Sequence, residues 1–427
     1  MPIDVAVPGR AVGNAHGSCY LTTAYHTEDQ VHAGERLTAA LTACTDSLAA
    51  LAGDRRLSAL DLTRTAFLDT ETTGLGGGVG TYAFLIGVGR FVPVPVPGQG
   101  SSRQTNQAPS PGNGAGATPA GSLTGLTGTP AGYTFELRQY FMRHPGEERA
   151  QLAEVADWVA DCTGLVTFNG RCFDMPLLAT RYALHRFAPL LPVPLHLDLL
   201  PLARRLWRGR LPSCALVSLE RHILGLERMD DVPGWLIPER YLRYQRDGDA
   251  RPLVGIIQHN ALDILSMVSL LTRVARAYRV PAEALDHGRD WLSLAKAYES
   301  AGEMERVIDA CEGAIERGLP PADADEAFRF LAAAARRLGD WDRAVAVWSD
   351  LAAAEAPRRL FPFEELAKYY EHRALDRDYP RALQITERAR ALIAGGVLHP
   401  PRGRRVALAE LDQRAARLRK KVARDEG

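Results

Sequence analysis

The sequence has no excess of charge of either sign. Lys plus Arg and Asp plus Glu each number 51, so the formal net charge at pH 7 is zero. No overall basic field draws this protein to a polyanion, and binding to nucleic acid has to depend on local patches or bound metal ions. Apolar residues make up 46% of the chain and charged residues 24%, which is ordinary for globular proteins and excludes disorder of the whole chain.

The sequence also lacks paired cysteines. Its six cysteines are scattered and none forms a Cys-x-x-Cys pair, which argues against a zinc knuckle and against a secreted disulfide scaffold. The start, MPIDVAVPGR, has neither the basic nor the apolar part of a secretion signal. We find no apolar run long enough to span a bilayer. We therefore expect a soluble, cytoplasmic protein with no membrane partner.

One segment, residues 98–132, is poor in both charge and large apolar side chains. It consists mainly of Gly, Pro, Ser, Thr, Asn and Gln, and Arg103 is its only charged residue. Such a composition cannot bury enough apolar surface to fold. We expect a flexible insertion at the tip of a hairpin, because the entropy of loop closure grows only slowly with length and the flanking strands can still pair.

The rest of the first 280 residues alternates between strand and helix patterns, and the total of 427 residues predicts two or three domains. Residues 1–60 give no clear fold, although GSCYLTTAYH is typical of a strand and residues 34–52 of a helix. We expect strands at residues 64–69, 81–91, 134–141, 164–168 and 194–200, and helices at 152–159 and 175–187. This order predicts an α/β domain at residues 61–280, with a mixed five-stranded sheet covered by helices.

Beyond about residue 281 the pattern is all-helical and repetitive. When WLSLAKAYESAGEMERVIDACEGAI is aligned with FRFLAAAARRLGDWDRAVAVWSDL, Trp291 falls on Phe328 and Gly302 on Gly339, and a third copy begins at FEELAKYY. The pattern resembles tetratricopeptide repeats, in which paired helices stack, and an ordinary helical bundle is the alternative. We expect an all-α repeat domain at residues 281–427.

Three segments of the α/β region carry acidic residues at positions suited to metal binding. In AFLDTETTGL, Asp69 and Glu71 are two apart on a strand and project from one face. Like charges that close repel unless a cation lies between them, and oxygen ligands suit Mg²⁺ or Mn²⁺ better than zinc. In LVTFNGRCFDMP, Asp174 opens a helix, either as an N-cap or facing a ligand at the strand end. In IIQHNALDILSMVSLL, His259 and Asp263 share one helix face.

Together and in this order, the three segments resemble the motifs of the DEDD (DnaQ-like) 3′→5′ exonucleases. The resemblance is greatest to the YprB-type ribonuclease H-like proteins with C-terminal tetratricopeptide repeats, and it covers about residues 60–280 plus the repeats. It implies an RNase H-like fold in which Asp69, Glu71, Asp174 and Asp263 hold two divalent ions, Mg²⁺ or Mn²⁺, about 4 Å apart. One ion lowers the pKa of the attacking water and the other stabilises the leaving 3′ oxygen.

In this resemblance His259 takes the place of the residue that activates water. The chain departs from the family here, because the histidine branch usually places its histidine five residues before the last Asp. His259 lies four residues before Asp263, which is the spacing of the tyrosine branch.

The resemblance also implies contacts with the substrate. Thr72, Gly74 and Leu75 would meet the terminal nucleotide, the alternative being a plain turn between strands. Phe168 and Asn169 would meet its sugar or base, although Phe168 suits a core position equally well.

Two further segments carry aromatic residues among charged ones. ARRLWRGR surrounds Trp207 with cations, a mixture that binds single strands but is also typical of a solvated helix face. Its arginines are Arg204, Arg205, Arg208 and Arg210. In DDVPGWLIPERYLRY, Trp235 and Tyr241 suit the rim of a cleft, but packing is the interpretation we favour.

The sequence therefore predicts a metal-dependent exonuclease that acts on 3′ ends of single-stranded DNA or RNA. Its repeats would bind a protein partner, and the resemblance to the family suggests a helicase as that partner. One alternative is a nucleic-acid-binding scaffold with an inactive nuclease fold, and another is a polynucleotidyl transferase or endonuclease. DNA and RNA both stay open, because recognition of the 2′-hydroxyl depends on the geometry of the pocket.

Overall fold

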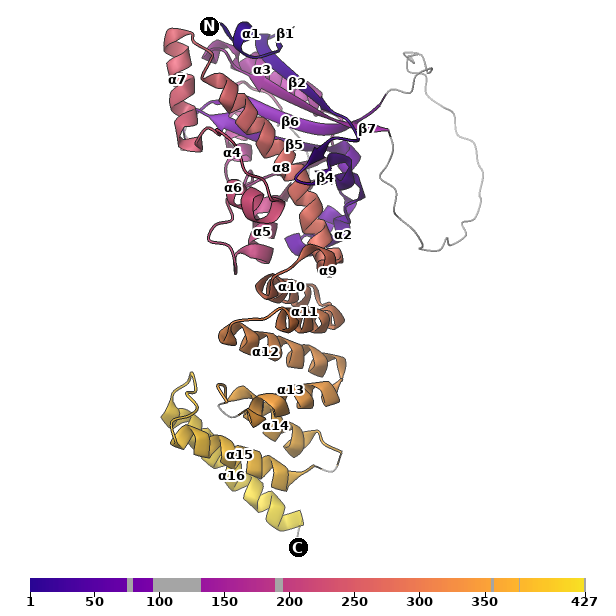
Figure 1. Cartoon of the computed structure of the whole chain (residues 1–427), viewed down its shortest axis with the longest axis vertical. Coiled ribbons are helices and arrows are strands. Elements are labelled where there is room, and N and C mark those ends of the chain that lie inside the picture. The colour runs from indigo at the N-terminus through magenta and orange to yellow at the C-terminus, as the bar shows by residue number, and fades with distance from the viewer. Residues whose placement is uncertain (75–79, 95–131, 189–194, 355–356, 376, 426–427) are drawn as a thin grey trace, which may run out of the picture. The chain divides into compact units, whose positions relative to one another are not determined.

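The computed structural model describes residues 1–74, 80–94, 132–188, 195–354, 357–375 and 377–425 (Figure 1). Two compact units make up the chain: residues 1–204 with 211–284, and residues 205–210 with 285–427. The flexible insertion expected at 98–132 lies outside the described residues except for Gly132, and so does the expected substrate contact Leu75.

The first unit contains a mixed sheet of seven strands among the described residues, in the order β1-β2-β7-β6-β5-β8-β9. The pairs β5–β8 and β8–β9 are parallel and the other neighbours are antiparallel. The strands are β1 (Arg10–Asn14), β2 (Gly17–His26), β5 (Thr65–Thr72), β6 (Ala83–Pro93), β7 (Tyr133–Phe141), β8 (Gly164–Thr167) and β9 (Leu195–Asp198). The mixed α/β sheet is thus confirmed, with all five expected strands present.

The two additional strands, β1 and β2, come from the N-terminal region for which the sequence gave no clear fold. β2 pairs with β7 from Tyr20 to His26, and its residues Cys19, Tyr20 and Leu21 are almost fully buried. Burial of these side chains is what makes the N-terminal residues part of the same sheet. The sheet therefore has seven strands where the sequence predicted five.

Helices cover the sheet and connect its parallel strands. A first cluster of buried side chains joins the sheet to α3 and α4, through residues such as Leu152, Val155 and Tyr182. A second joins Phe84 and Phe141 to α7 and α8. The α-helices of this unit are α1 (Ile3–Ala6), α2 (Thr45–Ala52), α3 (Glu148–Trp158), α4 (Asp174–Leu184), α5 (Leu199–Trp207), α6 (Leu216–Leu219), α7 (Ile237–Asp247), α8 (Leu253–Arg279) and α9 (Pro281–Ala284).

Short elements complete the unit. A small hairpin, β3 (Val31–His32) with β4 (Glu35–Arg36), precedes η1 and α2, so the helix expected at 34–52 is divided in two. The 3₁₀-helices are η1 (Leu37–Thr42), η2 (Arg55–Ala59), η3 (Leu62–Arg64), η4 (Pro145–Glu147) and η6 (Gly234–Leu236), and η5 (Glu220–Leu224) is a π-helical turn.

The long helix α8 is the apolar helix of the core. By length and composition it is long and apolar enough to cross a membrane, a feature that the sequence analysis did not identify. However, 61% of its most apolar window is buried inside the structure, and it contacts β5, β6 and β7. This burial is what a core helix requires, and it brings the polar residues of α8 to the edge of β5.

The second unit is built from consecutive helices, each in contact with the next (Figure 1). Gly302 and Gly339, which the sequence aligns with each other, end α10 and α12 in the same left-handed conformation, with φ of 84° and 80°. The expected many-helix region is thus confirmed. The helices are α10 (Gly288–Ala301), α11 (Met304–Glu316), α12 (Pro321–Leu338), α13 (Trp341–Ala353), α14 (Phe361–His372), α15 (Tyr379–Ala394) and α16 (Arg404–Asp425).

Candidate metal centre and active site

The first two candidate carboxylates lie at the end of β5. The strand begins with four buried residues and ends with four half-buried ones, Asp69 and Glu71 among them. Asn260 of α8 donates from Nδ2 to Asp69 Oδ2 at 2.8 Å. The helix comes this close because Gly87 lies opposite Asp69 on β6, where a Cβ atom would overlap the Asn260 side chain. A glycine therefore allows α8 to reach the end of the strand.

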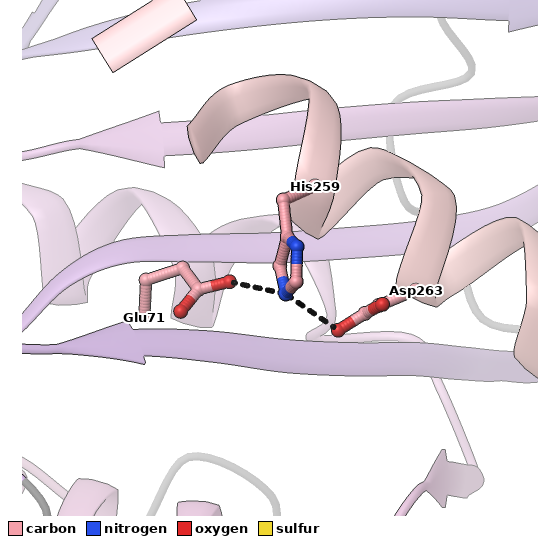
Figure 2. A group of neighbouring side chains, drawn as sticks. All are labelled: Glu71, His259 and Asp263. Atoms are coloured by element: carbon pink, nitrogen blue, oxygen red, sulfur yellow. Dashed lines mark ion pairs between the residues drawn. The ribbon is translucent and has the colours of Figure 1, made fainter. Parts of the chain in front are cut away.

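Helix α8 brings His259 and Asp263 to the same place. His259 Nε2 lies 3.6 Å from Asp263 Oδ2 and 3.9 Å from Glu71 Oε1, and Figure 2 shows the ring between the two carboxylates. One ligand atom from each of the three residues lies within 4.8 Å of the others, a grouping that could hold a metal ion. The four-residue spacing places His259 one turn from Asp263 on the same helix face.

Asp174 is the first residue of α4, and its carboxylate reaches toward β5. Thr70 donates from Oγ1 to Asp174 Oδ1 at 2.5 Å. The N-cap position belongs to Phe173, which makes no capping hydrogen bond through its side chain. Asp174 is therefore not the N-cap of α4 and its side chain faces β5, while its role toward a ligand stays a prediction.

The electrostatics of this cluster are those of like charges buried together. Burial raises the pKa of Asp69 well above its usual value, and the charges of Asp263, Asp174 and Glu71 raise it further. Burial likewise raises the pKa of Glu71. The pKa of Asp174 rises to about 6, mainly through burial. A divalent cation would relieve this repulsion, and the donors are the oxygen atoms that Mg²⁺ and Mn²⁺ prefer.

Two residues that the sequence analysis missed, Arg228 and Asp231, contact His259, and a third, Glu220, binds Arg228. Arg228, only 6% exposed, donates to both oxygens of Glu220 at 2.6 Å and pairs with Asp263. It also contacts Asp231, whose Oδ1 lies 2.8 Å from His259 Nδ1. Burial by itself would raise the pKa of Asp231, but the contacts with His259 and Arg228 hold that pKa below its usual value. No periodic pattern marks these residues, because Arg228 and Asp231 follow η5 in an irregular loop.

Two cavities open beside the carboxylates. One of about 300 Å³ is lined by Asp69, Glu71 and Asp174 together with the expected contact residues Thr72, Gly74, Phe168 and Asn169. The second, of about 420 Å³, shares Asp69, Phe168 and Asn169 and adds Arg204 and Asp263. Phe168 is half-buried and faces both cavities instead of belonging wholly to the core. Asn169 has a φ of 65°, and Asp198 Oδ1 accepts its backbone N–H at 2.7 Å.

The arginine-rich segment does not form the expected stacking patch. Trp207 is 1% exposed, so its ring cannot receive a nucleobase. Arg204 lines the second cavity, whereas Arg205, Arg208 and Arg210 belong to the second unit, where Arg210 forms an ion pair with Asp290. The roles of Arg204, Arg205 and Arg208 in substrate binding stay predictions.

The two aromatic residues Trp235 and Tyr241, for which packing was the favoured interpretation, differ in burial. Tyr241 is 1% exposed and stacks on Phe84 at a centroid distance of 4.0 Å, which confirms the packing interpretation. That interpretation is wrong for Trp235, which is 70% exposed. Its neighbours Gly234 and Ile237 line the first cavity.

Comparison with known proteins agrees with this architecture. A family model described as the RNase_H superfamily matches residues 116–275, a range that includes Asp174, His259 and Asp263. The chain is also similar to the uncharacterized protein YprB of Bacillus subtilis (strain 168), with 31% identity over 325 residues. That alignment covers 76% of this chain and 68% of the relative. The chain therefore belongs to the same family as YprB, and its first unit has the RNase H-like fold.

Proposed function

We propose that the protein is a metal-dependent exonuclease that removes nucleotides from the 3′ end of single-stranded nucleic acid. The observation that carries this proposal is the meeting of Asp69, Glu71, Asp174 and Asp263 beside His259, from β5, α4 and α8. Burial of several carboxylates together costs stability unless a cation compensates for their charge. Such an arrangement is suited to hydrolysis of a phosphodiester at a metal centre.

The residues have separable roles in this proposal. Asp69, Glu71, Asp174 and Asp263 would hold the metal ions, and His259 Nε2 would accept the proton of the attacking water. When bound, the ions supply a lowered pKa for that water and stabilise the leaving 3′ oxygen. Hydrolysis in this direction releases nucleoside 5′-monophosphates.

The cavities fit the end of a strand. Phe168 and Asn169 line both of them, so a terminal nucleotide in one cavity and its neighbour in the other would contact the same two residues. Thr72 donates to the carbonyl of Gly74 at 2.8 Å, which braces the turn at the edge of the first cavity. These contacts support the assignment of Thr72, Gly74, Phe168 and Asn169 to substrate binding.

The second unit would recruit a protein partner. Its successive helices and the shared glycine conformation after α10 and α12 support tetratricopeptide-like repeats, which commonly present binding surfaces. A helicase is the partner that we propose, because it would supply single-stranded ends to the first unit.

The direct test is degradation of 3′- and 5′-end-labelled single-stranded DNA and RNA in Mg²⁺ or Mn²⁺. We expect stepwise shortening from the 3′ end that stops in EDTA and falls at least about 100-fold in Asp69→Asn. Asp46→Asn is the matched control, because it removes an exposed carboxylate from α2 of the same unit. A circular single strand should stay intact, whereas an endonuclease would cut it.

Equal trimming by wild type and Asp69→Asn, or none by either, would sink the proposal. Tight binding of oligonucleotides without turnover and without a need for metal would favour the nucleic-acid-binding scaffold instead.

A further inference from the structure

We propose that Asp231 is a positioning residue for His259: it holds Nδ1 as the protonated ring nitrogen, so that Nε2 faces Glu71 and Asp263 as the nitrogen with the lone pair. This inference rests on the proposed function in one respect, since the orientation serves catalysis only where His259 accepts a proton. The geometry itself is independent of that role.

The contact between the two side chains fixes the tautomer. His259 Nδ1 lies 2.8 Å from Asp231 Oδ1, a hydrogen-bond distance. An ionised carboxylate can only accept, so the proton of this bond has to sit on the ring nitrogen. A neutral imidazole carries one such proton, which leaves Nε2 unprotonated. That nitrogen is the one 3.6 Å from Asp263 Oδ2 and 3.9 Å from Glu71 Oε1.

A competing contact comes from Arg228, whose Nη1 lies 3.2 Å from the same Nδ1. A protonated Nδ1 has no lone pair for this donor, and the shorter distance belongs to Asp231. The Arg228 group has another acceptor within reach, because its Nη1 is 3.1 Å from Asp231 Oδ2. The arginine therefore binds the carboxylate that in turn binds the ring.

Asp231 is itself held in place, as a positioning residue has to be. Its Oδ1 accepts the backbone N–H of Val232 at 2.8 Å, and its Oδ2 accepts from Arg228. Arg228 is anchored on both oxygens of the almost fully buried Glu220. A chain of fixed contacts thus runs from Glu220 through Arg228 and Asp231 to the ring of His259. Carboxylates that orient a histidine in this way are widespread in metal and hydrolytic sites.

The contact with Asp231 also restrains the ring of His259. A histidine four residues before Asp263 projects from the same helix face, and its ring has rotational freedom that the helix alone does not restrain. Asp231 supplies the restraint from a different element, the loop before η6.

The test reads the tautomer directly and does not need nuclease activity. Protein carrying ¹⁵N-labelled histidine is studied by NMR in EDTA at pH 8, and the His259 ring among the eleven histidines is assigned by its loss in His259→Gln. We expect a protonated Nδ1 and an unprotonated Nε2 in the wild type. Asp231→Ala should lose that pattern, and Asp231→Glu should restore it in part.

Kinetics on a labelled single strand form the second readout. In Asp231→Ala we expect kcat to fall about 10- to 100-fold with little change in KM, because the ring is misplaced while the substrate cavities are intact. Asp230→Asn is the matched control, since it removes the neighbouring acidic charge, which has no contact with His259 among the described contacts.

A wild-type ring protonated on Nε2, or the same tautomer in wild type and Asp231→Ala, overturns the proposal. So does an equal loss of kcat in Asp230→Asn. If the tautomer is as expected but the wild type degrades no strand, the orientation of His259 stands while the exonuclease proposal and the catalytic use of that orientation fail.

Discussion

At the scale of single residues, the site brings several carboxylates together in a place that is largely shielded from solvent. Asp69 and Glu71 both have raised pKa values, because burial and neighbouring carboxylates disfavour their ionised forms. A group whose pKa is raised by folding stabilises the folded state only at low pH, and that contribution is lost as the pH rises. The cluster should therefore weaken the metal-free protein at neutral pH.

Replacement of Asp174 by Asn tests this cost. The pKa of Asp174 rises from 3.8 to about 6 on folding, which corresponds to at most about 3 kcal/mol of lost stability above pH 6. Asn keeps an oxygen that can accept from Thr70 and carries no charge. We expect the variant in EDTA to melt above the wild type at pH 8 and near it at pH 4. A variant that is less stable than the wild type at pH 8 would contradict the account.

Addition of metal should reverse that order. In the proposed metal centre these carboxylates hold Mn²⁺, so the ion should raise the melting temperature of the wild type more than that of Asp174→Asn or Asp69→Asn. A ligand at 100 times its Kd stabilises by about 2.7 kcal/mol, which thermal unfolding readily detects. The Asp46→Asn protein should gain as much as the wild type, and an equal gain in all four proteins would exclude these carboxylates as ligands.

How far the sequence predicts this site depends on regular spacing. Asp69 and Glu71 share a face because strands repeat every two residues, and His259 and Asp263 do so because helices repeat every 3.6. Arg228 and Asp231 belong to an irregular stretch, where nothing in the sequence indicates which way a side chain points. The environment of His259 therefore required the three-dimensional structure.

At the scale of elements, the decisive packing is that of α8 against the sheet. Gly87 and Gly89 on β6 both lie under α8, and a Cβ atom at Gly87 would come within 2.5 Å of Ile264 Cδ1 as well as overlapping Asn260. The sequence shows the glycines inside a strand pattern but not what approaches them. It likewise does not show that β1 and β2 extend the sheet, since pairing of β2 with β7 joins segments more than 100 residues apart.

Gly87→Ala should separate α8 from the end of β5. The added methyl group has no space, so we expect a loss of about 1–3 kcal/mol in unfolding free energy. Because Asn260 and His259 are carried by the same helix, nuclease activity should fall more than the loss of folded protein explains. Gly80→Ala is the matched control, since a Cβ atom there meets nothing within 4 Å. Denaturant unfolding and activity measured on both variants give the comparison, and equal effects would contradict the packing argument.

At the scale of the whole molecule, the balanced charge of the chain is distributed into separate local groups. In the first unit the carboxylates gather at the end of β5, and Arg228 pairs with one of them, Asp263, and with the buried Glu220. In the second unit a buried acid binds basic residues of the last helix: Glu371 of α14 accepts from Arg417 at 2.8 and 3.0 Å and from Lys421 at 2.9 Å. Neither group is visible in the net charge of zero, and the second joins residues 46 and 50 positions apart.

Glu371 should make the second unit sensitive to acid. Burial by itself would raise the pKa of Glu371, but the hydrogen bonds from Arg417 and Lys421 lower this pKa from 4.5 to about 2. A carboxyl group with a lowered pKa contributes stability that is fully present above pH 4.5 and is lost as the pH falls toward 2. Glu371→Gln should therefore lower the free energy of unfolding by about 1–3 kcal/mol at pH 7. The loss is smaller than for a fully buried ion pair, because Arg417 is half exposed and solvent screens the interaction.

The difference between the variant and the wild type should shrink as the pH falls from 5 to 3, because the carboxyl of the unfolded wild type takes up a proton in this range while that of the folded protein stays ionised. Calorimetry of the full chain across this pH range measures it. Glu387→Gln is the matched control, since its exposed ion pair with Arg419 should contribute little at any pH. A constant difference from pH 7 to pH 3 would mean that Glu371 acts through its shape in the core and not through its charge, and α16 would then be held to α14 by packing alone.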